Sequence, residues 1–182
     1  MSLQSIFSRY PAFGFSGSRS PAGRLPVSAL SACASAVPVG SRVFVGCASG
    51  VDAYFRQCFP SAEVFSVASG RWGSGRSAFA RRSVACVRAV GESGGLWVSF
   101  PASPCPSSLV PASSSSSCFC GSGSGTWASL AFAVGSDVPS LVFSPAGIPA
   151  SWGLSPVAGC PGWFGCPLAL GLEFAPVQLS LF

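Results

Sequence analysis

The sequence predicts an α/β protein with a doubly wound sheet of about five mainly parallel strands and helices on both faces. Short apolar runs alternate along the chain with helix-like runs, which is typical of strand–helix–strand units. Each apolar run is bounded by turn residues, as expected of parallel strands that are covered on both faces. Glycine-rich turns follow several of these runs, where such a sheet binds its ligands.

Each expected strand is a short run dominated by β-branched, aromatic or other apolar side chains. We expect strands at residues 13–15, 42–47, 63–67, 96–100 and 141–143.

The runs between these strands have helical features. We expect helices at residues 25–37, 51–59, 77–90 and 127–134. The first tolerates Pro26 near its start, and the second carries Asp52 in its first turn, where a negative charge is favourable. The third places Phe79, Ser83, Cys86 and Val90 at three- and four-residue spacing.

Two segments depart from this alternation. Residues 101–120 carry several prolines and a serine tract, so we expect a flexible loop or lid. We assign residues 1–145 to this doubly wound domain and 146–182 to a C-terminal extension that is rich in Gly, Pro and Trp. The extension could wrap over the sheet edge, bind a second subunit or remain loose.

Composition excludes several kinds of chemistry. All ten basic residues are arginines, and the chain has no histidine. A histidine base, a lysine Schiff base and a Ser-His-Asp triad are therefore excluded. The net charge of +5 mildly favours anionic ligands but is too small to diagnose nucleic-acid binding. The nine cysteines are odd in number and contain no CxxC pair, so we expect reduced thiols, no metal and no cofactor.

The hydropathy of the chain is high enough that a membrane-spanning segment has to be considered. Hydrophobic residues make up 49% of the chain, and the mean hydropathy is +0.55. No stretch of about 18 apolar residues escapes Gly, Pro or Arg, and residues 1–10 have no apolar core of signal-peptide length. We expect no membrane partner and a cytoplasmic location, and the apolar content predicts a homo-oligomer.

Three glycine turns are candidate ligand sites. They are Gly17-Ser18-Arg19 after the first strand, Ser49-Gly50-Val51-Asp52 after the second, and Gly123-Ser124-Gly125-Thr126 at the start of the last helix. A glycine turn that opens a helix leaves backbone N–H groups and the positive end of the helix dipole for a phosphate. The convergence of three such turns at one edge of the sheet predicts a pocket of nucleotide size.

These turns, with the arginine-rich helix around Arg82, resemble the SLOG superfamily, which joins DNA-processing protein A with the Lonely Guy phosphoribohydrolases. The resemblance spans roughly residues 13–145 and implies a Rossmann-like fold that binds a nucleotide or a phosphorylated nucleotide-like ligand. With the turns, it selects the following ligand-binding residues: Gly17, Ser18, Arg19, Ser49, Gly50, Asp52, Arg82, Gly123, Ser124, Gly125 and Thr126.

Departures from the Lonely Guy motifs bear on catalysis. Their MxxRKxxM motif is approached by residues 79–86, where Arg82 matches the arginine and Ser83 replaces the lysine. Their PGGxGTxxE motif is approached by residues 121–129, where Ser129 replaces the glutamate that is expected to carry hydrolysis. The loss of this glutamate favours a non-catalytic binding protein. A phosphoribohydrolase that uses a displaced carboxylate, with Glu92 as the best substitute, stays open.

The branch of DNA-processing protein A implies a third function, the binding of single-stranded DNA by a recombination mediator. Such binding needs a basic groove and exposed aromatic faces. The candidate residues for DNA are Arg71, Trp72, Arg76, Arg81 and Arg88. Nucleotide binding without catalysis is the leading prediction, and DNA binding and nucleotide hydrolysis are its alternatives.

Overall fold

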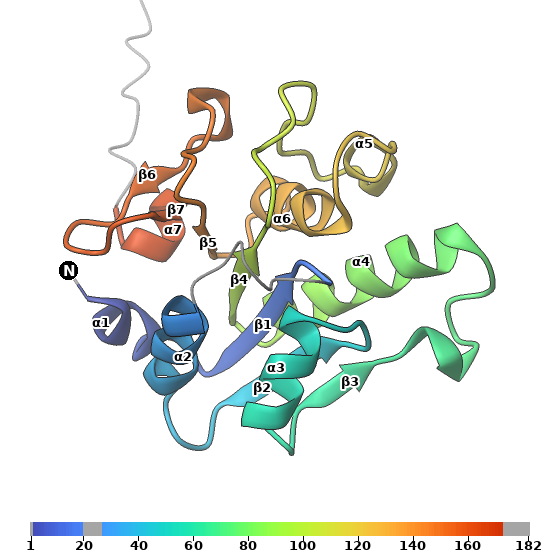
Figure 1. Ribbon diagram of the computed structural model, residues 1–182, viewed down its shortest axis with the longest axis horizontal. Helices are drawn as coiled ribbons and strands as arrows, with labels where there is room; N and C mark the ends of the chain where they lie inside the picture. The colour runs from blue at the N-terminus through green and yellow to red at the C-terminus, as the bar shows by residue number, and fades with distance from the viewer. Residues whose placement is uncertain (1, 20–26, 173–182) are drawn as a thin grey trace, which may run out of the picture.

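The computed structural model describes residues 2–19 and 27–172, and in these residues seven strands form one sheet (Figure 1). The strand order is β3-β2-β1-β4-β5-β7-β6. The strands are β1 (Ala12–Gly17), β2 (Arg42–Gly46), β3 (Glu63–Phe65), β4 (Leu96–Phe100), β5 (Ser140–Phe143), β6 (Ser155–Pro156) and β7 (Trp163–Gly165). All five predicted strands are present, each within a few residues of its expected bounds.

The four predicted helices are present as well, although residues 25 and 26 of the first lie outside the described residues. They are α2 (Val27–Ala36), α3 (Val51–Cys58), α4 (Arg76–Glu92) and α6 (Gly125–Gly135). Three short α-helices were not expected: α1 (Leu3–Phe7), α5 (Ser115–Cys118) and α7 (Pro167–Leu170). The 3-10 helices η1 (Val67–Ser69) and η2 (Ala150–Trp152) were not expected either. α1 begins with a capping box between Ser2 and Ser5. This helix is too short to show the apolar periodicity from which a longer helix is predicted.

The sheet is mixed but mostly parallel. β3, β2, β1, β4 and β5 pair in parallel, whereas β7 pairs antiparallel with both β5 and β6. The predicted α/β class with a mainly parallel sheet is confirmed. The sheet has seven strands where about five were predicted, because residues 155–165 of the C-terminal segment add β6 and β7 beside β5. Trp163 anchors β7, since its ring is buried against Phe100 and Phe143.

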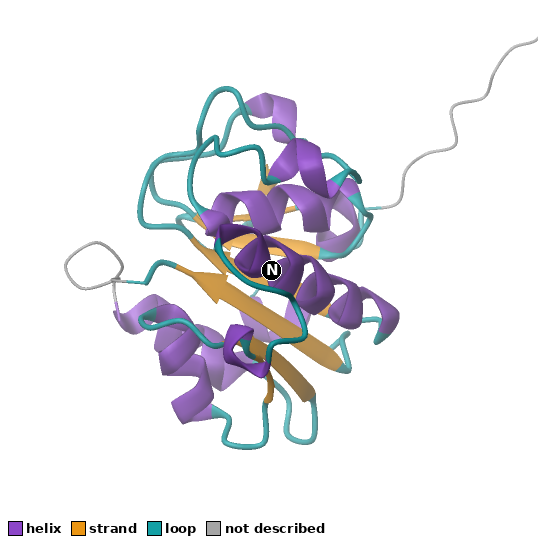
Figure 2. Ribbon diagram, turned by 90° about the vertical axis from the view of Figure 1, so that its right-hand side faces the viewer, coloured by secondary structure: helices purple, strands orange, loops and turns teal. Residues whose placement is uncertain are grey.

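Alternating side chains of the strands build two apolar layers. Figure 2 shows helices on both sides of the sheet. Phe13 and Phe15 of β1 join the layer that contains buried residues of α1, α2, α3 and α7. Trp97 of β4 joins the opposite layer, with residues of α4 and α6. Gly14 lets α4 approach this second face, because a Cβ there would press on Trp97 and Val90. The two-residue period of the strands thus accounts for a sheet covered by helices on both faces.

The segment predicted as a flexible loop or lid, residues 101–120, contains the short helix α5 in its serine tract. Two tryptophans hold the segment against the protein. The Nε1–H of Trp127 donates to the carbonyl oxygen of Ser103 at 3.0 Å, and that of Trp152 to Leu109 at 3.0 Å. Figure 1 shows α5 beside α6, so this segment forms one wall over the carboxyl end of β4.

The order in which the chain adds strands to the sheet reverses at β1. From β1 the chain proceeds to β2 and β3 on one side and then returns to β4 on the other side. In open α/β sheets, a crevice forms outside the carboxyl ends of the two strands at such a switch point. Among the described residues, no helix has the length and apolarity needed to span a membrane. That same part of the chain contains no cluster of three or more potential metal ligands.

Candidate functional site

A cavity of about 620 Å³ lies at this switch point, outside the carboxyl ends of β1 and β4. Its volume is within the roughly 300–1,000 Å³ that is usual for small-molecule sites. The cavity brings together nine of the eleven predicted ligand-binding residues: Gly17, Ser18, Arg19, Asp52, Arg82, Gly123, Ser124, Gly125 and Thr126. Segments that are far apart in the sequence thus meet around one space.

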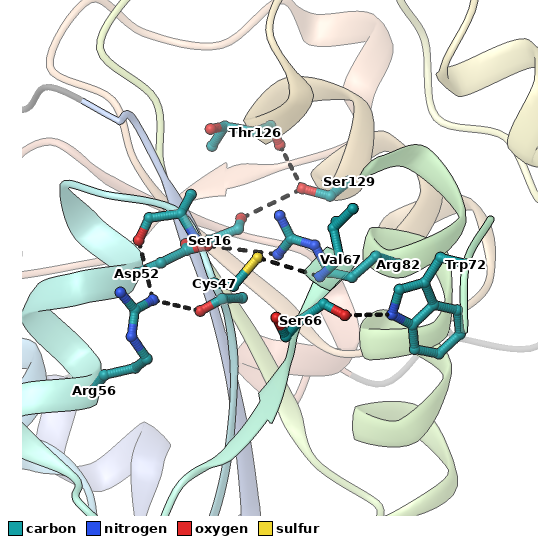
Figure 3. Close-up of polar contacts among 12 residues, drawn as sticks. Ser16, Cys47, Asp52, Arg56, Ser66, Val67, Trp72, Arg82, Thr126 and Ser129 are labelled. Atoms are coloured by element: carbon teal, nitrogen blue, oxygen red, sulfur yellow. Dashed lines mark hydrogen bonds and ion pairs between the residues drawn. The ribbon is translucent and has the colours of Figure 1, made fainter. Parts of the chain in front are cut away.

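The charged centre of the cavity is an ion pair between Arg82 of α4 and Asp52 of α3 (Figure 3). Arg82 Nη1 lies 3.5 Å from Asp52 Oδ2, and both residues are buried. The Nε–H of Arg82 is also buried and has no hydrogen-bond partner among the described residues. A buried donor without an acceptor costs free energy, so Arg82 retains capacity to bind an incoming anion.

Asp52 is held by groups from the end of β2. Its Oδ2 accepts a hydrogen bond from the backbone N–H of Ala48 at 3.2 Å. Arg56 reinforces the same turn by donating to the carbonyl oxygens of Gly46 at 2.6 Å and Ala48 at 3.0 Å. Burial raises the pKa of Asp52 above its ordinary value, although the charge of Arg82 and the Ala48 N–H lower it. Gly46 makes room for the ion pair, because a Cβ there would overlap both Arg82 and Asp52.

The start of α6 forms the opposite wall. Ser124 is the N-cap of this helix, and its side chain accepts a hydrogen bond from the backbone N–H of Trp127 at 3.4 Å. The first N–H groups of a helix have no acceptor within the helix and carry partial positive charge. Gly123 has a φ of 88°, a value that favours glycine, whereas the Cβ position of Gly125 is open space. This wall is therefore suited to an anionic oxygen.

The hydroxyl groups of Ser16 and Ser129 lie along the inner side of the cavity, and the buried hydroxyl of Ser99 contacts Ser16. Ser16 Oγ and Ser99 Oγ are 2.9 Å apart. Ser129 Oγ donates to the carbonyl oxygen of Thr126 at 3.0 Å and lies 3.4 Å from Ser16 Oγ (Figure 3). Ser129, which replaces the expected glutamate, lines the cavity but is 2% exposed. Asp52 is consequently the one carboxylate among the described lining residues. Glu92 lines a different hollow and does not supply a substitute in this cavity.

The two remaining predicted residues support the cavity from behind. Ser49 and Gly50 do not line it. Ser49 Oγ donates to the carbonyl oxygen of Arg19 at 3.1 Å, and Gly50 packs so closely that a Cβ would overlap the carbonyl oxygens of Ser18 and Arg19. The next N–H, of Val51, donates to the Ser18 carbonyl at 3.0 Å. The second glycine turn thus positions the first.

Sequence reasoning did not select two aromatic residues of the cavity as ligand-binding residues. Phe79 of α4 is 40% exposed, and the Cζ of Arg19 lies 5.1 Å from the centre of its ring. Phe119, just after α5, lines the cavity from the other side. The position of Phe79, about one helical turn before Arg82, is a signal that the sequence does contain. Phe119 had none, because its position depends on how residues 101–120 fold.

Three of the five candidate residues for DNA line one hollow along α4: Trp72, Arg81 and Arg88. Arg71 is exposed in a turn, and nothing is described of the side chain of Arg76. Trp72 stacks on Phe65 with ring centres 6.1 Å apart, and its Nε1–H donates to the carbonyl oxygen of Ser66 at 3.1 Å.

Both remaining arginines of this set have contacts as well. Arg81 Nη1 donates to the Trp72 carbonyl at 3.2 Å, and the Cζ of Arg88 lies 5.8 Å from the centre of the Phe132 ring.

Comparison of the chain with family models, with curated proteins and with solved structures found no match.

Proposed function

We propose that the protein binds a nucleotide or a phosphorylated nucleotide-like ligand in the cavity between β1, α4 and α6, without catalysing its breakdown. The observation that carries the proposal is the buried Arg82, with an unpartnered Nε–H, opposite the open start of α6. A phosphate between them would accept charge-assisted hydrogen bonds from Arg82 and from the helix N–H groups.

The rest of the cavity suits the rest of a nucleotide. Phe79 offers an exposed ring on which a base can stack, and Arg19 lies over the same ring. Ser16 and Ser18 supply hydrogen-bonding groups of the kind that a ribose needs. The order β3-β2-β1-β4-β5 of the parallel strands supports a Rossmann-like, doubly wound fold. Membership of the SLOG superfamily is part of the proposal and rests on the sequence motifs alone.

Binding without hydrolysis is favoured by the side chains around the cavity. Hydrolysis of a glycosidic bond normally uses a carboxylate that is free to act as a base or nucleophile. Asp52 is the one carboxylate among the described lining residues, and it is already paired with Arg82. We therefore expect no free base to accumulate when the protein is incubated with nucleoside monophosphates.

Gly125 offers a direct test that spares the fold. We expect Gly125→Asp to weaken the binding of adenosine monophosphate by about 100-fold, because a carboxylate would then repel the phosphate. The helix should tolerate the change, since the Cβ position is open space and an acidic residue is favourable in the first turn. Isothermal titration calorimetry measures the affinity, and thermal unfolding checks the fold.

Gly125→Asn is the matched control, because it has nearly the same shape without the charge. It should keep the affinity within about fivefold of the original protein. Equal affinity of the original protein and the Asp variant would refute phosphate binding at α6. If the affinity for the monophosphate changes little with salt concentration, the result supports nucleotide binding in the cavity. Salt-sensitive binding of single-stranded DNA, with no nucleotide bound, would instead favour the DNA-binding alternative.

A further inference from the structure

A second hollow, of about 930 Å³, runs along α4 next to the first cavity. The two hollows share three lining residues, Ala80, Phe119 and Gly121. Both volumes together exceed the roughly 300–1,000 Å³ of a usual small-molecule site. The two hollows therefore adjoin at these residues, and we call the second one the α4 groove.

The α4 groove has a charged and an apolar part. On the α4 side it is lined by Ser77, Ala80, Arg81, Val84, Ala85, Arg88, Ala89 and Glu92. The spacing of three and four residues places these side chains along one face of the helix. Arg81 and Arg88 lie roughly 10 Å apart along the helix axis, since each residue advances the helix by about 1.5 Å. Two arginines against Glu92 give the groove a net positive charge.

The two arginines differ in what they already bind. Arg81 is committed to the Trp72 carbonyl, as described above. Arg88 is exposed and lies over the Phe132 ring, a contact that positions its guanidinium without neutralising its charge. Val84, Ala85 and Ala89 form an apolar strip beside it, on which a flat ring can rest. Arg88 is thus the group of this groove best placed to bind a second anion.

We propose that the ligand is a dinucleotide, two nucleotides joined through phosphate, rather than a single nucleotide. One phosphate lies between Arg82 and the start of α6, and the second nucleotide lies along the α4 groove with its anionic group at Arg88. The inference rests on the proposed function, because it extends the ligand from the same cavity. It is carried by the three lining residues that the two hollows share and by the charge of the groove.

The test compares adenosine monophosphate with a linear adenylyl dinucleotide that carries a 5′-phosphate, by isothermal titration calorimetry. We expect the dinucleotide to bind about tenfold more tightly, since it adds a charge-assisted contact. Arg88→Gln should remove most of this gain and change the affinity for the monophosphate by less than about twofold. Arg42→Gln is the matched control, because Arg42 is exposed and lines neither hollow.

The outcomes of this test distinguish a failure of this inference from a failure of the proposed function. Binding of the monophosphate with no gain for the dinucleotide overturns the inference and leaves the proposed function intact. Binding of neither compound refutes both. A gain that Arg88→Gln and Arg42→Gln reduce equally reflects net charge alone and overturns the role of the groove. Affinity that continues to rise as the oligonucleotide is lengthened beyond two residues overturns the dinucleotide in favour of single-stranded DNA.

Discussion

Replacing Arg82 with glutamine should weaken the binding of adenosine monophosphate by about 10- to 100-fold, because hydrogen bonds to a charged group contribute about 1.5–3 kcal/mol. Glutamine keeps much of the length of the side chain and a hydrogen-bonding end but loses the positive charge. Isothermal titration calorimetry measures the loss. An unchanged affinity would mean that Arg82 does not bind the phosphate, even if Gly125→Asp weakens binding.

The same substitution should destabilise the protein in a manner that depends on pH. Arg82→Gln leaves the buried carboxyl of Asp52 without its counter-charge, and the loss of one partner of a buried ion pair costs about 3–5 kcal/mol. Burial already raises the pKa of Asp52, and without Arg82 that pKa rises further. Above this raised pKa the carboxylate is charged and the full cost applies. As the pH falls through it, Asp52 becomes protonated and the cost disappears.

Urea unfolding of both proteins at about pH 7 and about pH 4 measures this dependence. The difference in unfolding free energy between them should be several-fold larger at the higher pH. Arg42→Gln provides a control with the same chemical change, because Arg42 and Glu63 form an exposed ion pair at 3.6 Å. Its cost should stay below about 1 kcal/mol. An Arg82→Gln cost that is equal at both pH values would contradict the role assigned to Asp52.

Gly50→Ala should destabilise the protein by about 3–5 kcal/mol, through backbone strain and overpacking together. Gly50 has a φ of 71° and a ψ of −125°, a conformation that side chains rarely allow. Its Cβ would also overlap the carbonyl oxygens of Ser18 and Arg19, which belong to backbone and cannot turn aside. Since the displaced segment lines the cavity, nucleotide affinity should fall with stability. Urea unfolding and calorimetry measure the two effects.

Gly40→Ala separates the two causes. Gly40 also has a positive φ, of 84°, but no heavy atom lies within 4 Å of its Cβ position. This variant should lose only about 1–2 kcal/mol, from strain alone, and keep its nucleotide affinity. If Gly50→Ala costs no more than Gly40→Ala, the close packing of the second glycine turn on the first is not important for the fold.

The main elements of the fold could be predicted because their signals are local. β4 has the predicted bounds, 96–100, since an unbroken run of apolar and β-forming residues defines it. α4 follows a regular spacing of buried positions and extends beyond the prediction by one residue at its start and two at its end. β6 and β7 could not be predicted from such signals. They contain two and three residues and are stabilised by pairing with an existing edge.

The candidate site also has a part that the sequence predicted and a part that it did not. The glycine turns and Arg82 were visible in the sequence because they are short motifs with unusual residues. The sequence did not indicate which of these turns line the cavity and which support it. Ser49 and Gly50 belong to the same kind of turn as Gly17, but in the structure they support that turn from behind the cavity. Glu92 was the predicted substitute for the missing glutamate, because it follows the arginine-rich helix, yet it lines the α4 groove.

By itself, the sequence determined the α/β class, the places where the chain turns and the absence of lysine and histidine chemistry. These properties depend on residue type and on spacing of a few positions. Only the tertiary structure decided that Arg82 pairs with Asp52, that Phe79 and Phe119 enter the cavity, and that a second groove adjoins it. Such contacts join residues that are tens of positions apart, and they depend on how helices and strands pack rather than on any local pattern.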